Sequence, residues 1–187
     1  MRFLRPFIFL LVSFAALPAA AADWLNQEVA YSGTRTMRMN GQEISGPIYY
    51  DHGKERFEWA TEGDRQVSLR RPDSQRFYMI MLDRGMGMEM KIDDPRAMMD
   101  MTVAGTLAPE EMGRETREGE SVTKFRVVEE QVTFLFWVTD DGIPLHIEGI
   151  QGGERVEVSL SDLERGPQPA ELFEPPAGIQ IIPMPDQ

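Results

Sequence analysis

The chain has 187 residues, no cysteine and a formal net charge of −12 at pH 7. The lack of cysteine excludes a disulfide, a cysteine nucleophile and lipid attachment to an N-terminal cysteine. An acidic surface repels nucleic-acid phosphates and anionic lipid headgroups, so we expect no nucleic-acid partner.

The first 22 residues have the layout of a secretory signal peptide. Arg2 and Arg5 precede an apolar stretch at 7–17, and small residues at 19–22 follow it. The apolar stretch is too short for a comfortable membrane anchor, and no other segment approaches spanning length. We therefore expect cleavage after residue 22, export to the periplasm, and one monomeric domain over residues 23–187 without a transmembrane segment.

After the signal, short runs rich in β-branched, aromatic and Met residues alternate with turn signals, a pattern that predicts an antiparallel meander. Asn40-Gly41 offers the positive φ angles of a tight hairpin. The expected strands of this first block lie at residues 29–39, 43–50, 54–60, 65–70, 75–82 and 86–92.

A helical insertion is predicted over residues 93–113. Asp93-Asp94-Pro95 favours a helix that runs to residue 101, and a second short helical turn is expected at 109–112. A second block of strands follows, and the tail adds a short turn at 170–173 and an extended apolar stretch at 179–182. The strands of the second block are expected at residues 114–118, 121–130, 132–139, 143–150 and 155–163. The fold class is mainly β, a curved antiparallel half-open barrel of about ten or eleven strands.

Alternation within the strands predicts one apolar face, on which methionines recur at a spacing of two. Met side chains are flexible and polarizable, so a Met-lined face adapts to apolar ligands of variable shape. We expect residues 98, 99 and 101, all Met, to cover this groove and Arg35 to lie at its rim. The expected groove residues are Phe57, Trp59, Val67, Leu69, Phe77, Met79, Met81, Met86, Met88, Met90, Met98, Met99, Met101, Phe134 and Phe136.

The same pattern has other interpretations. The strands at 77–82 and 134–138 are apolar on both faces, which also suits ordinary burial between two sheets. Met-x-Met pairs are, in addition, suitable soft ligands for Cu(I) in an oxidising compartment. Plain core packing, an apolar groove and copper binding therefore stay open at this point.

No catalytic arrangement is evident. The only histidines are His52 and His146, and no zinc-protease, nucleophile-elbow, phosphate-loop or dinucleotide motif occurs. We expect a protein that is not an enzyme and needs no cofactor or metal.

The layout resembles the LolA and LolB lipoprotein-carrier superfamily, and within it the LolA-like domains. The residues that carry the resemblance are Gly142-Ile143-Pro144-Leu145 and Leu172-Phe173-Glu174-Pro175-Pro176-Ala177-Gly178. The resemblance implies an incomplete barrel whose concavity holds acyl chains of lipoproteins or other lipids. We expect a periplasmic binding or carrier protein for a lipid, a lipoprotein or an apolar peptide. The alternative is a regulatory module that contacts another envelope protein.

Overall fold

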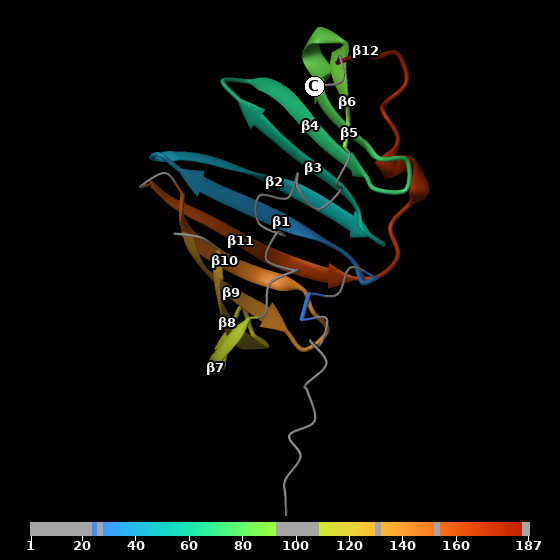
Figure 1. The fold of residues 1–187 in the computed structure, drawn as a ribbon. Helices are drawn as coiled ribbons and strands as arrows, with labels where there is room; N and C mark the ends of the chain where they lie inside the picture. Colours follow the sequence, from blue (N-terminus) through green and yellow to red (C-terminus); the bar gives the residue numbers. More distant parts are fainter. Residues whose placement is uncertain (1–23, 26–27, 93–108, 130–131, 152–153, 185–187) are drawn as a thin grey trace, which may run out of the picture.

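The computed structural model describes residues 24–25, 28–92, 109–129, 132–151 and 154–184 (Figure 1). The predicted signal peptide, the predicted helix at 93–101 and Met98, Met99 and Met101 lie outside the described residues. The strands are β1 (Ala30–Met39), β2 (Gln42–Asp51), β3 (Lys54–Thr61), β4 (Asp64–Arg71), β5 (Arg76–Met81), β6 (Met86–Lys91), β7 (Glu110–Arg117), β8 (Glu120–Glu129), β9 (Val132–Thr139), β10 (Pro144–Gln151), β11 (Glu154–Arg165) and β12 (Gln180–Pro183). Two short 3₁₀ helices are η1 (Leu82–Arg84) and η3 (Ala170–Phe173).

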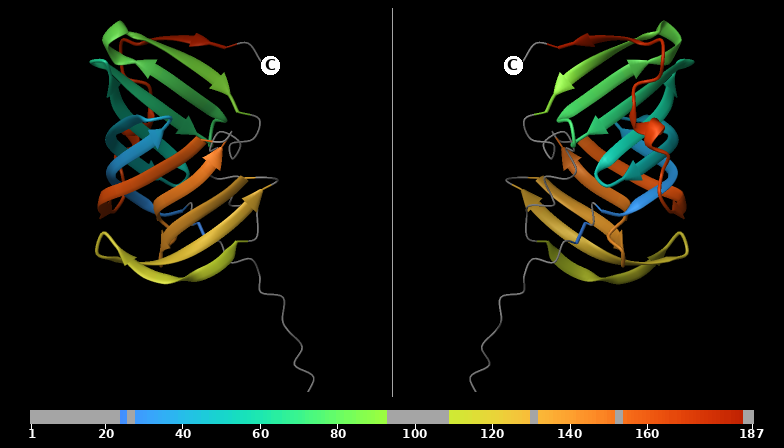
Figure 2. Two further views of the ribbon diagram at one scale, coloured as in Figure 1. Left: turned by 90° about the vertical axis from the view of Figure 1, so that its left-hand side faces the viewer. Right: turned by 90° about the vertical axis from the view of Figure 1, so that its right-hand side faces the viewer.

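All twelve strands form one sheet in the order β12-β6-β5-β4-β3-β2-β1-β11-β10-β9-β8-β7. Two antiparallel meanders, β1 to β6 and β7 to β11, join where β1 pairs with β11. Only β12 is parallel to its neighbour, β6. Figure 2 shows the sheet curving strongly without closing, which leaves β7 and β12 at opposite edges. The expected class, a mainly β curved open sheet, is confirmed.

Local sequence explains the β1–β2 hairpin. Asn40 and Gly41 have φ angles of 56° and 73°, the left-handed values that a two-residue turn between twisted strands requires. Asn and Gly adopt these values at little cost. The pairing then runs without interruption from Met39 opposite Gln42 to Ala30 opposite Asp51.

Two sequence-based expectations are wrong. Residues 109–112 were expected as a helical turn, but Glu110–Arg117 form β7, which pairs with β8 along its length. Ladder hydrogen bonds to β8 outweigh the weak local helix preference of this segment. The sheet also has twelve strands rather than ten or eleven, because the apolar tail expected only as an extended stretch adds to the sheet beside β6.

The C-terminal tail covers the convex face of β3 and β4. Arg56 donates a hydrogen bond of 2.9 Å to the Leu172 carbonyl, and Arg71 donates one of 3.0 Å to the carbonyl of the buried Phe173. A small apolar cluster lies on this side, with the partly buried residues of the tail packed against it. Its members are Val67, Leu69 and Ile80, with Tyr78, Leu82, Ile179 and Ile181 around them.

No helix among the described residues is long and apolar enough to cross a membrane.

Candidate functional site

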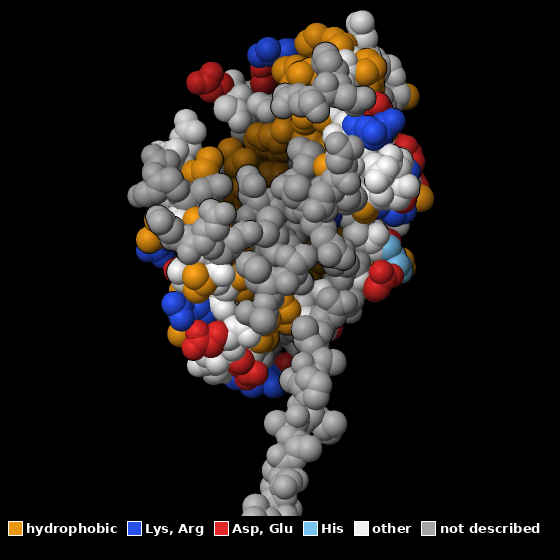
Figure 3. Space-filling view, viewed as in Figure 1, with side chains coloured by type: hydrophobic (Ala, Val, Ile, Leu, Met, Phe, Trp, Pro, Cys, Tyr) orange, Lys and Arg blue, Asp and Glu red, His pale blue; other side chains and the backbone are white. Residues whose placement is uncertain are grey.

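The concave face of β5 and β6 carries a strip of methionines. Cross-strand pairing places Phe77 opposite Met90, Met79 opposite Met88 and Met81 opposite Met86, so all six side chains share one face. We call these six residues the methionine strip, and each is half-buried. Figure 3 shows hydrophobic side chains lining a hollow in the upper part of this view.

Two aromatic residues of β3 belong to the same face. The Phe57 and Trp59 rings stack with a centroid distance of 5.1 Å and an interplanar angle of 20°. Register through β4 aligns Phe57 with Ser68 and then with Met79, which sets both rings beside the methionine strip. Eight of the fifteen expected groove residues therefore lie together on the concave side of β3, β5 and β6.

Val67 and Leu69 were expected in this groove, but the register contradicts that placement. Val67 lies opposite Glu58 and Leu69 opposite Arg56, so both belong to the face that Phe57 does not occupy. Both side chains are fully buried in the convex cluster beneath the tail. The reason is a phase error, since period-two alternation separates two faces within each strand but does not align them between strands.

The other half of the concave face is filled by the chain itself. Phe136 of β9 is fully buried, and the Trp24 ring lies edge-on to it at 5.0 Å between centroids. We call this region the filled half. Phe134 belongs to it too, with its ring over Gly149 of β10. The remaining members are Leu25, Phe125, Val127, Val138, Ile147 and Val158.

A polar cluster separates the filled half from the methionine strip. It consists of Tyr31, Arg35, Tyr50, Glu55 and Arg70, from β1 to β4. Arg35 donates hydrogen bonds of 2.8 and 2.9 Å from its two terminal nitrogens to the two carboxylate oxygens of Glu55. Their side chains are only 16% and 14% exposed. Arg35 was expected at the groove rim; the structure places it in this ion pair, 5.5 Å from the centre of the Phe57 ring.

Burial and charge set the ionisation of this cluster. Burial would raise the pKa of Glu55, but the charge and hydrogen bonds of Arg35 and the charge of Arg70 together lower it. Burial raises the pKa of Tyr31 and Tyr50. Tyr31 and Tyr50 therefore stay neutral phenols, stacked with 5.1 Å between ring centroids, while Glu55 is the carboxylate.

Sequence reasoning missed Arg70, Glu55 and both tyrosines. Arg70 follows Leu69, so grouping Leu69 with the groove assigned Arg70 to the wet face. The pairing of Arg70 with Glu55 and Phe77 puts it on the concave face, where it is 5% exposed. The signal that could have found Arg70 is its pairing position opposite Phe77, which puts the two side chains on the same face of the sheet.

Comparisons with known proteins support the fold alone. No protein-family model and no curated protein matches the sequence. A solved structure of an uncharacterized conserved protein from Thermus thermophilus is similar, with a TM-score of 0.63, 11% identity, and coverage of 84% of this chain and 91% of that one.

The chain is also similar to MucB. A structure of MucB in complex with MucA(peri) has a TM-score of 0.55 and 20% identity, over 87% of this chain and 62% of that chain. The Pseudomonas aeruginosa MucA/MucB complex has a TM-score of 0.54 and 19% identity, over 88% and 64%. The chain thus spans less than two thirds of the MucB chain. At the level of the fold, these likenesses support the curved open sheet described above.

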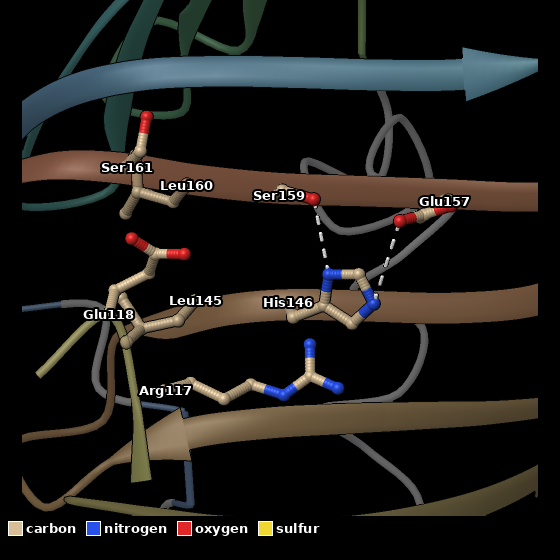
Figure 4. A pocket seen from close by; sticks show the side chains of 8 residues that line it. All are labelled: Arg117, Glu118, Leu145, His146, Glu157, Ser159, Leu160 and Ser161. Atoms are coloured by element: carbon tan, nitrogen blue, oxygen red, sulfur yellow. Dashed lines mark hydrogen bonds and ion pairs between the residues drawn. The ribbon is translucent and has the colours of Figure 1, made fainter. Parts of the chain in front are cut away.

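The register of β10 and β11 puts a separate polar site on the face opposite that of Ile147 and Val158, and Figure 4 shows it from close by. His146 Nδ1 is 3.1 Å from the Ser159 hydroxyl, and its Nε2 is 2.9 Å from a Glu148 carboxylate oxygen. Burial would raise the pKa of Glu148, but the His146 hydrogen bond and the charge of Arg155 lower it. The adjoining cavity of about 270 Å³ is lined by Arg117, Glu118, Leu145, His146, Glu157, Ser159, Leu160 and Ser161.

Hydrolysis by a Ser–His–Glu set requires more than these three side chains. Acyl transfer needs N–H donors aimed at the developing oxyanion. Backbone N–H groups of β10 and β11 lie in the plane of the sheet and pair along the ladder from His146–Ser159 onward. The three side chains instead form a cross-strand hydrogen-bond network, with the His146 ring edge-on to Trp137 at 5.0 Å between centroids. Among the described residues, no group of three or more His, Cys, Asp or Glu is arranged to hold a metal.

Proposed function

We propose that the protein binds an acyl chain of a lipid or lipoprotein along the methionine strip, as a periplasmic carrier or binding protein and not as an enzyme. One observation carries the proposal: a half-buried strip of five Met and one Phe lies on the concave face of an open sheet. A strip that served only as core would be closed, as the filled half is, where Phe136 is fully buried.

The energetics suit this ligand. Each buried methylene contributes about 0.8 kcal/mol, so about eight methylenes give roughly 6 kcal/mol before the cost of ordering the ligand. The strip spans five residues of β5, or about 14 Å at the strand rise. Thioether side chains adjust their rotamers to chains of different shape, which favours a class of ligands over a single compound.

The test uses protein purified without detergent from cells that express the full chain. Mass spectrometry of the native protein is expected to show a co-purified lipid, and a fluorescent acyl probe is expected to bind it. Met88→Gln keeps the size of the side chain but makes it polar, so the variant should bind the probe several-fold more weakly. Met39→Gln is the matched control, because Met39 is 51% exposed at the end of β1.

Absence of lipid and of probe binding would overturn the proposal. Equal loss of probe binding in Met39→Gln and Met88→Gln would show that the probe does not report on the strip. The predicted export is tested separately: the N-terminus of protein recovered from the periplasm should begin at residue 23.

A second candidate function is binding of an apolar peptide from an envelope protein. The observation that favours it is the likeness to MucB, which was solved in complex with MucA(peri). In-cell crosslinking that captured one dominant protein, together with native protein free of lipid, would favour this alternative over acyl binding.

A further inference from the structure

Arg70 of β4 is a buried cation at the end of the methionine strip. It lies opposite Phe77 of β5, whose other neighbour is Met90 of β6. On the other side it lies opposite Glu55 of β3. The residue is 5% exposed, and its Nε and Nη2 atoms are buried with no hydrogen-bond partner among the described residues.

These two unpartnered atoms form one edge of the guanidinium group, an edge that can bind both oxygens of a carboxylate. Two other arginines of this chain show what the edge does when it is occupied. Arg71 Nε and Nη2 are each 2.9 Å from an oxygen of Asp73. Arg165 uses the same two atoms for Asp141, at 2.6 and 3.2 Å. The equivalent edge of Arg70 is buried and has no hydrogen-bond partner among the described residues.

Within the part of the chain that the structure describes, the charge balance of the polar cluster leaves Arg70 without a carboxylate of its own. Both oxygens of Glu55 are engaged by Arg35 at 2.8 and 2.9 Å. The cluster therefore holds two guanidinium groups and one carboxylate, an excess of one positive charge. Burial of a cation whose Nε and Nη2 donors are unsatisfied is unfavourable, so the site is suited to receive a single anion.

We propose that the Nε–Nη2 edge of Arg70 binds the carboxylate of a long-chain fatty acid whose hydrocarbon chain lies along the methionine strip. This inference rests on the proposed function and names its ligand class. A planar carboxylate matches the edge in geometry and the cluster in charge. The ligand head then lies at Arg70, beside Phe77 and Met90, and the chain extends toward Met81 and Met86.

The experiment compares a long-chain fatty acid with the fatty alcohol of equal chain length, at a pH where the acid is ionised. Affinities for the wild type, Arg70→Gln and Arg70→Lys are measured by displacement of the acyl probe. Arg76→Gln is the matched control, because Arg76 faces the convex side of β5 and pairs with Glu89 at 3.1 Å. Circular dichroism checks that each variant is folded.

The wild type should prefer the acid over the alcohol by about tenfold or more, the effect of charge-assisted hydrogen bonds. Arg70→Gln should lose this preference while its affinity for the alcohol is unchanged. Arg70→Lys should keep only part of the preference, since an ammonium retains the charge but lacks the two-point edge. Arg76→Gln should behave as the wild type.

Equal binding of acid and alcohol by the wild type, or an intact preference in Arg70→Gln, overturns the inference and leaves acyl binding in place. Stronger binding of a phosphate-headed lipid of the same chain length overturns the assignment of a carboxylate. Failure of both the acid and the alcohol to bind overturns the proposed function and this inference together.

Discussion

The polar cluster predicts opposite stability effects for two neighbouring substitutions. Glu55→Gln removes the only carboxylate of the cluster and leaves Arg35 and Arg70 as buried cations. Arg70→Met removes the guanidinium whose Nε and Nη2 atoms have no partner among the described residues. In the second variant the Arg35–Glu55 pair, with its two hydrogen bonds, stays intact.

The magnitudes follow from burial. Removal of one partner of a buried ion pair costs about 3–5 kcal/mol, and the 14–16% exposure of these side chains places Glu55→Gln near 3 kcal/mol. For a domain of this size, that corresponds to a melting temperature about 6–12 °C lower. Arg70→Met should gain about 1 kcal/mol, or about 2–4 °C, because an apolar side chain suits the site better than a buried guanidinium with two unsatisfied donors.

Thermal unfolding followed by circular dichroism measures both effects in protein stripped of lipid. Met39→Gln serves as the control, since a substitution at an exposed side chain should change the melting temperature very little. A melting temperature of Glu55→Gln within about 1 °C of the wild type would refute the buried-pair reasoning. A large destabilisation by Arg70→Met would show that the guanidinium has a partner in the free protein.

The pH dependence of stability provides a second measurement on the same pair. The pKa of Glu55 is lowered in the folded protein from its ordinary value of 4.5. A carboxyl with a depressed folded pKa stabilises fully above its unfolded pKa and loses that effect as the pH falls through the folded pKa. The difference in melting temperature between the wild type and Glu55→Gln should therefore be constant above about pH 5 and shrink below pH 4.5. A difference that was as large at pH 2 as at pH 6 would contradict the assignment.

Three further predictions concern the rest of the concave face. Gly149→Ala should destabilise by about 1–3 kcal/mol in denaturant unfolding, because the new Cβ would meet Phe134 ring atoms at 2.4 Å. Trp24→Ala should cost about 2–3 kcal/mol, since its ring packs at 5.0–5.1 Å from two Phe rings of the filled half; no change would mean that the half is closed without it. Cu(I) titration should show weak binding that is equal in the wild type and Met88→Gln, because the proposed function uses the thioether of Met88 as apolar surface; tight binding lost in the variant would support the copper alternative.

Local signals in the sequence were sufficient where the structure is decided locally. The Asn40-Gly41 turn depends on two φ angles, and the residue types reveal them. Alternation along residues 76–81 and 86–91 likewise reveals which side chains share a face, so the grouping of Met79 with Met88 follows from turn position and period.

The contacts that could not be predicted from the sequence depend on the register between strands that are distant along the chain. Arg35 and Glu55 meet only because β2 lies between their strands and aligns Arg35 with Gly46, and Ile48 with Phe57. A shift of one residue in either pairing would reverse the facing of one side chain. The packing of Trp24 over Phe136 has no periodic signal at all, since Trp24 precedes the first strand.

The cost of Arg70 in the free protein and its benefit in the complex arise from the same group, and this links the two experiments on it. A ligand that binds only the folded state stabilises it according to its concentration relative to its dissociation constant. If a fatty acid satisfies the buried Nε and Nη2 donors of Arg70, Arg70→Met should raise the melting temperature of the free protein. The same substitution should reduce the further rise that the fatty acid produces. The rise produced by the alcohol should be the same in both proteins. A variant whose free protein melted higher while its response to the fatty acid was unchanged would separate burial of Arg70 from ligand binding, and the guanidinium would then have a structural role alone.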